Sequence, residues 1–97
     1  MPTYITLLTY TQQGVGSIKD SASRLDAAKK AFQSMGAEIK GFYLVMGQYD
    51  ALVISEAPND ETAAKLALAT GALGNVRTET LRAFTEDEFR KLIASLP

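Results

Sequence analysis

Residues 3–10 form the first long run of β-forming side chains, and they alternate between two faces. Ile5, Leu7 and Thr9 would lie on one face, and Tyr4, Thr6, Leu8 and Tyr10 on the other. Both faces are apolar or amphipathic, which is typical of a central strand whose two sides are both covered.

Two further runs of β-forming residues, 37–46 and 49–56, flank the short break at Gly47 and Gln48. This arrangement predicts a β-hairpin. Residues 76–84 alternate charged and β-branched side chains more openly, a pattern that favours an edge strand protected by its charges.

Apolar residues at helical spacing predict a long helix over residues 18–35. The repeating positions are Leu25, Ala28, Phe32 and Met35. The glycine-containing segment 11–16 is expected to be a loop, with Ser17 as the helix N-cap and Asp20 near the positive end of the helix dipole. Gly36 is expected to end this helix.

Two more helices are predicted later in the chain. Residues 62–72 are rich in alanine and leucine and follow Asn59, an expected N-cap. Thr85 and Glu88 have the spacing of a capping box, which predicts a final helix that runs to about Ser95.

The resulting order, β-α-β-β-α-β plus a C-terminal helix, predicts one α+β domain over residues 1–97 with a ferredoxin-like fold. We expect an antiparallel four-stranded sheet of order 4-1-3-2, with helices on one face only. The open face is expected to carry Tyr43, Val45, Ala51 and Val53 together with Tyr4 and Leu8. Because that face would be largely apolar, we predict a homodimer in which two sheets stack face to face as a dimeric α/β barrel; the alternative is a monomer with an open amphipathic sheet face.

Composition excludes several classes of function. Ten basic and eleven acidic residues give a net charge of −1 without a basic cluster, so the chain lacks the footprint of a nucleic-acid binder. Cysteine and histidine are both absent, which excludes disulfides, thiol and histidine chemistry and most transition-metal sites, and leaves only a carboxylate site for a hard cation open. Glu86, Asp87 and Glu88 could form such a site, but helix capping accounts for them better, so we expect no metal and no cofactor. The N-terminus does not resemble a signal peptide, and no apolar run approaches the roughly 20 residues that span a membrane. These features predict a cytoplasmic protein.

Strand directions predict that four segments meet at one end of the sheet. They are residues 10–11, 14–20, 47–50 and 71–76. Free backbone N–H groups at a helix start beside Lys19 could bind a small anion, although the glycine spacing is not that of a P-loop, and a loop capped by Ser17 is the structural alternative. Asp50 could accept backbone hydrogen bonds, act as an acid or base, or pair with Lys19 or Arg24.

Three sequence strings resemble the GYD-domain family, small and mostly bacterial proteins named for a Gly-x-Tyr-Asp turn. They are T-Q-Q-G-V-G-S-I-K-D-S-A-S-R at 11–24, G-Q-Y-D at 47–50 and E-A-P-N-D-E at 56–61. The resemblance implies the dimeric α/β-barrel type of ferredoxin-like fold and implies little about activity. Its motif positions are the candidates for a shared ligand site: Gly14, Lys19, Asp20, Arg24, Gly47, Tyr49 and Asp50.

Three hypotheses of function follow. The first is a homo-oligomeric module that binds a small ligand, such as an anion, or a protein partner. The second is a cofactor-free isomerase or monooxygenase that acts in a cavity between sheet and helices, with Asp50 or Asp20 as base, Tyr49 or Lys19 as donor and Arg24 binding a substrate carboxylate. The third is a purely structural assembly unit.

Overall fold

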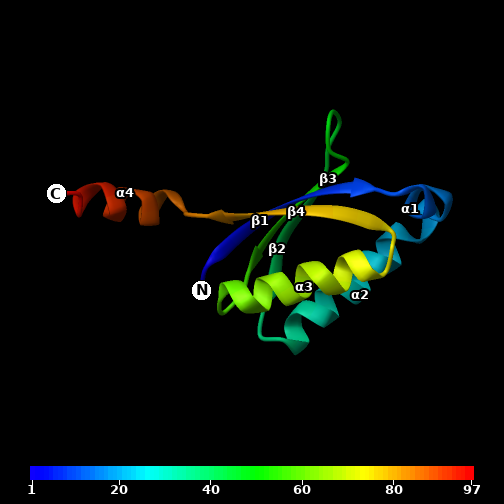
Figure 1. Cartoon of the computed structure of the whole chain (residues 1–97), viewed down its shortest axis with the longest axis horizontal. Coiled ribbons are helices and arrows are strands. Elements are labelled where there is room, and N and C mark those ends of the chain that lie inside the picture. Colours follow the sequence, from blue (N-terminus) through cyan, green and yellow to red (C-terminus); the bar gives the residue numbers. More distant parts are fainter.

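A computed structural model describes residues 1–97 as a four-stranded antiparallel sheet with two helices packed on one side of it (Figure 1). The strands are β1 (Thr3–Tyr10), β2 (Glu38–Leu44), β3 (Ala51–Glu56) and β4 (Val76–Ala83). The helices are α1 (Gln12–Gly16), the 3-10 helix η1 (Ile18–Asp20), α2 (Ser21–Ser34), α3 (Asp60–Ala72) and α4 (Glu86–Ala94). None of these helices has the length and apolar character needed to cross a membrane.

The strand order is β2-β3-β1-β4, which is 4-1-3-2 when it is counted from the β4 edge. β1 pairs antiparallel with both β3 and β4, so β1 and β3 occupy the centre of the sheet. β4 lies at an edge, which confirms the interpretation of its alternating charges.

The prediction of a loop at residues 11–16 was wrong, because this segment forms the short helix α1. Thr11 is its N-cap and accepts a hydrogen bond from the Gly14 N–H. The single helix predicted over residues 18–35 is divided into η1 and α2. Ser17 does not cap it, since the Ser17 hydroxyl donates to the Gln13 carbonyl oxygen instead.

The two later helix starts are as predicted. The Asn59 side chain caps α3 by accepting from the Thr62 N–H at 2.8 Å. Thr85 and Glu88 form a complete capping box at the start of α4. Hydrogen bonding from the Thr85 backbone lowers the pKa of the Glu88 carboxyl, because the bond favours the ionised form.

The assignment of side chains to the two faces of the sheet was wrong for Tyr4, Leu8, Ala51 and Val53. These four lie on the covered face, where Tyr4, Ala51 and Val53 are buried. Alternation therefore places the opposite set of β1 and β3 residues on the uncovered side. We call this side the open face and define it by Ile5, Leu7, Tyr43, Leu52, Ile54 and Leu81.

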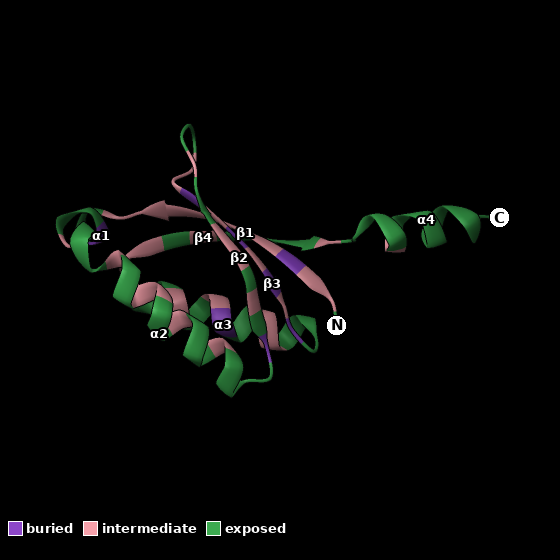
Figure 2. Ribbon diagram, turned by 180° about the vertical axis from the view of Figure 1, so that it is seen from behind, coloured by how far each residue is buried: buried purple, intermediate pink, exposed green.

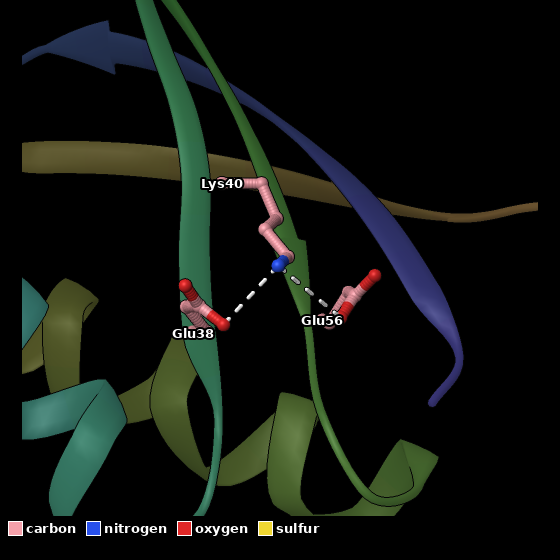
Figure 3. Close-up of polar contacts among 3 residues, drawn as sticks. All are labelled: Glu38, Lys40 and Glu56. Atoms are coloured by element: carbon pink, nitrogen blue, oxygen red, sulfur yellow. Dashed lines mark ion pairs between the residues drawn. The ribbon is translucent and has the colours of Figure 1, made fainter.

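A β-bulge at Lys40 explains why Tyr43 still lies on the open face. The register shifts by one residue between Ile39 and Gly41, which turns Phe42 toward the helices and Tyr43 away from them. Lys40 lies between two carboxylates, 3.2 Å from Glu38 and 3.9 Å from Glu56 (Figure 3). It offsets the repulsion between these glutamates, which are directly opposite each other in the ladder.

Full burial is confined to a small part of the molecule (Figure 2). The core cluster consists of Tyr4, Ala37, Ala57 and Leu66, with Phe32 and Ala63 packed against it. The buried side chains lie between the sheet and the two long helices, whereas the tip of the β2–β3 hairpin and all of α4 except Glu88 are exposed.

Candidate functional site

The base of the β2–β3 hairpin is attached to the end of β1 by Asp50. Its Oδ2 accepts a hydrogen bond from the Tyr10 N–H at 2.8 Å, and its own N–H donates to the Leu8 carbonyl oxygen at 2.8 Å. The Asp50 carbonyl oxygen also accepts from the Val45 N–H at 2.9 Å, so the loop is wider than the predicted Gly47-Gln48 turn. Of the three predicted roles of Asp50, the observed contacts are backbone hydrogen bonds and include no ion pair.

At the same end of the sheet, α1 is docked on the loop between α3 and β4. The Thr11 N–H donates to the Asn75 carbonyl oxygen at 3.1 Å, and the Thr11 hydroxyl donates to the Gly74 carbonyl oxygen at 2.5 Å. Gly14 is buried so closely that an added Cβ would lie 2.0 Å from the Asn75 oxygen. These contacts confirm that the end of β1, the helix entry, the hairpin base and the α3–β4 loop meet.

Arg24 fastens α2 to the preceding short helices. Its guanidinium donates to the Ser17 carbonyl oxygen at 2.9 Å, to the Ser17 hydroxyl at 3.1 Å and to the Ser21 hydroxyl at 3.0 Å. A longer bond of 3.4 Å reaches the Gly14 carbonyl oxygen. The donors of this side chain are therefore largely occupied within the chain itself.

The other predicted site residues are not gathered around Asp50. Lys19 and Asp20 are exposed on η1, and their side chains make no hydrogen bond or ion pair. Gly47 is in the hairpin tip at a φ of +128°, and a Cβ added there would meet no atom within 4 Å. Tyr49 donates to the Glu79 Oε2 at 2.6 Å, and this hydrogen bond raises the pKa of the Tyr49 phenol.

A cavity of about 390 Å³ lies between the sheet and the two long helices. Leu8, Phe32, Phe42 and Leu66 are among its mostly apolar lining residues. Of the predicted site residues, Arg24 alone lines it. This lining suits an apolar molecule and does not contain the acid–base pairs that the enzyme hypothesis used.

Sequence reasoning missed the polar contact between Tyr4 and Asp60. Tyr4 is 3% exposed, and its hydroxyl donates to the Asp60 Oδ1 at 2.5 Å. Burial raises the pKa of the Tyr4 phenol, and the Asp60 hydrogen bond and charge raise it further. The two residues are 56 positions apart, so only the packing of α3 on the sheet brings them together.

Comparison with known proteins identifies a family, a relative and two structures of similar fold. Residues 4–93 match the family model of the GYD domain. The chain is 31% identical over 84 residues to the Thermus thermophilus protein named "Glutamine synthetase and cystathionine beta-lyase binding protein". That alignment covers 86% of this chain and 88% of the relative.

Two crystal structures have a similar fold. One is of a protein from Thermus thermophilus, with a TM-score of 0.52 and 25% identity over 88% of this chain and 95% of the other. The second, of a hypothetical protein from Pyrococcus horikoshii, has a TM-score of 0.55 and 20% identity over 89% of this chain and 93% of the other.

Proposed function

This chain belongs to the GYD-domain family, and we propose that it is a homo-oligomeric protein-binding module. In this proposal, two copies pair through the open face, and the paired body binds another protein. The name of the Thermus thermophilus relative, which describes binding to two enzymes, supports the second part.

The open face is the observation that carries the proposal. It places leucine or isoleucine at the four central positions of β1 and β3, whereas the covered face has Thr6, Val53 and Ser55 at neighbouring positions. Four large aliphatic side chains are thus on the side that no helix covers, while the covered face also holds Tyr4 and Leu8. Apolar patches above a few hundred Å² are uncommon on monomers and mark interaction surfaces.

Polar groups frame this apolar surface. The Lys40 cluster with Glu38 and Glu56 lies at one end of the sheet (Figure 3), and the Tyr49–Glu79 hydrogen bond lies over β4. An apolar centre with a polar rim is the usual anatomy of a protein–protein interface. This arrangement supports face-to-face stacking of two sheets as a dimeric α/β barrel.

Only two of the predicted site residues, Lys19 and Asp20, are given a binding role in our proposal. Arg24, Asp50 and Gly14 hold the meeting point of β1, α1 and the hairpin together. Lys19 and Asp20 carry charges without a partner inside the chain. In our proposal these two make the charged contacts with the bound protein.

A second candidate function is binding of a small apolar molecule in the cavity between sheet and helices. The cavity volume of about 390 Å³ and its mostly apolar lining support it. Native mass spectrometry of the freshly purified protein tests it, because a bound metabolite would add a discrete mass. A spectrum with no added mass that is unchanged by incubation with medium-chain fatty acids would contradict this candidate.

Sedimentation velocity tests the proposed dimer. Leu7 is at the centre of the open face, so Leu7→Glu should place a charge in the contact and produce monomers that remain folded. Lys29→Glu, which brings the same carboxylate to an exposed position of α2, should leave the dimer unchanged. A wild-type protein that is monomeric at high concentration refutes the dimer.

Surface plasmon resonance tests whether this chain binds glutamine synthetase or cystathionine beta-lyase, with both enzymes purified from the organism that encodes this chain. Binding by wild type that weakens in a Lys19→Glu, Asp20→Lys double variant supports the proposal. Failure to bind either enzyme refutes the transfer of the relative's partners to this chain.

A further inference from the structure

α4 stands away from the rest of the molecule. In Figure 1 it extends beyond the end of β4, and Figure 2 shows it exposed apart from a half-buried position in its first turn, Glu88. Every hydrogen bond and ion pair made by residues 85–96 is local, such as the Glu86–Arg90 pair at 2.8 Å. The sheet and the other helices of the chain therefore give this helix no hydrogen bond and no ion pair.

One side of α4 is nevertheless strongly apolar. Phe89, Leu92 and Ile93 are 55%, 49% and 51% exposed, and Leu96, just after the helix, is 65% exposed. Their spacing places all four on the same side of the helix, which we call the α4 stripe. An amphipathic helix with such a stripe is stabilised mainly by burying it.

The helix also has a fully formed start but too few residues to be stable alone. Its capping box satisfies the first backbone N–H groups. α4 has 9 residues, whereas isolated helices shorter than about 12–15 residues are marginal in water. A helix of this kind requires a surface to pack on, and that surface belongs to another molecule.

We propose that the α4 stripe docks on a second copy of this chain and forms part of the homodimer contact. This inference rests on the proposed pairing through the open face. α4 follows β4, the edge strand of that sheet, so the helix begins beside the edge of the surface that pairs in the proposed dimer. α4 extends past the end of its own sheet (Figure 1), and in the proposed pair its apolar stripe packs on the other copy.

The buried area favours a second copy as the occupant. A stable interface buries about 800 Å² on each partner. The half-exposed side chains of the α4 stripe offer roughly 400 Å² of apolar surface, so the sheet face must supply only the remainder. A closed pair with two-fold symmetry would bury both copies of the stripe and leave neither exposed.

Hydrogen exchange of the whole chain at two concentrations tests the docking directly. Amides of residues 89–94 should be protected above the dimer dissociation constant and should exchange much faster after dilution below it. The β1 amides should stay protected in both samples, because β1 is central in each copy. Equal protection of α4 in monomer and dimer would overturn the proposal.

A pair of variants measures the contribution of the stripe. Phe89→Glu should raise the dimer dissociation constant about a hundredfold, because it removes an anchor and introduces a charge into the contact. Ala94→Glu adds the same charge on the opposite side of α4 and should leave that constant unchanged. Neither residue contacts the core, so both variants should keep the wild-type melting behaviour of the monomer.

The outcomes separate this inference from the proposed function. A wild-type dimer whose dissociation constant is unaffected by Phe89→Glu overturns docking of α4 and leaves the sheet-to-sheet dimer standing. If the protein is a dimer but the α4 amides exchange as fast as in the monomer, the α4 stripe does not dock on the second copy and the proposal is overturned. If wild type is monomeric at all concentrations, both the sheet-to-sheet dimer and the docking of α4 are refuted.

Discussion

Removing the Asp50 carboxylate should destabilise the fold, because this group satisfies the backbone N–H of Tyr10 at 2.8 Å. A hydrogen bond to a charged group contributes about 1.5–3 kcal/mol, and a neutral one about half of that. Asp50 is partly exposed, so we expect Asp50→Ala to lower the free energy of unfolding by about 2 kcal/mol. Asp50→Asn keeps an acceptor and should cost about 1 kcal/mol or less.

For a domain of this size these losses correspond to about 4–8 °C in melting temperature for each kcal/mol. Circular dichroism at one fixed protein concentration measures them, since the proposed dimerisation would make the midpoint depend on concentration. Asp26→Ala is the matched control, because the exposed Asp26 carboxylate on α2 has no hydrogen-bond partner. If Asp50→Ala had the same melting temperature as wild type but lost partner binding, Asp50 would be a recognition residue and our structural interpretation would be refuted.

Two further predictions concern the core and the α1 contact. Tyr4→Phe should lower the free energy of unfolding by about 1–2 kcal/mol. In wild type, the free energy of unfolding should also fall as the pH rises above 10.0. The reason is that the folded protein raises the pKa of the buried Tyr4 phenol above this ordinary value, so the phenol contributes its full stabilisation only below pH 10.0. Urea unfolding across that range should show a smaller alkaline loss in the variant; an equal loss would contradict the assignment. Gly14→Ala should cost about 2 kcal/mol or more, since its Cβ would meet the Asn75 oxygen at 2.0 Å. Gly16→Ala has open space and should be neutral or slightly stabilising in the same assay, so equal effects of the two substitutions would refute the role of the close contact.

The elements that could be predicted from the sequence are those set by local signals. The caps at Asn59 and Thr85 depend on a side chain and an N–H three residues apart, and both are formed. α1 could not be predicted in this way, because Gly14 and Gly16 are poor helix formers. Its helical form is stabilised by contacts of Thr11 and Gln13 with the distant α3–β4 loop, so tertiary structure overrides local propensity.

The orientation of the sheet faces could not be derived from alternation. A period of two sorts β1 residues into two sets, but both sets are apolar enough to be covered. The helices lie on the side of Tyr4, where small residues such as Ser55 and Ala51 leave room for them. The leucine and isoleucine residues at the centre of the other set are left uncovered, which strengthens the argument for a partner over that face.

The G-Q-Y-D turn at residues 47–50 also has a clearer physical role in the structure than its sequence suggested. Gly47 has a left-handed φ, Tyr49 is hydrogen-bonded to Glu79 on β4, and Asp50 is hydrogen-bonded to β1. The last two residues thereby attach the β2–β3 hairpin to two different strands. A motif used in this way fixes the position of the hairpin beside the open face. The sequence feature by which the family is recognised therefore holds the hairpin in place beside the face for which we propose a partner.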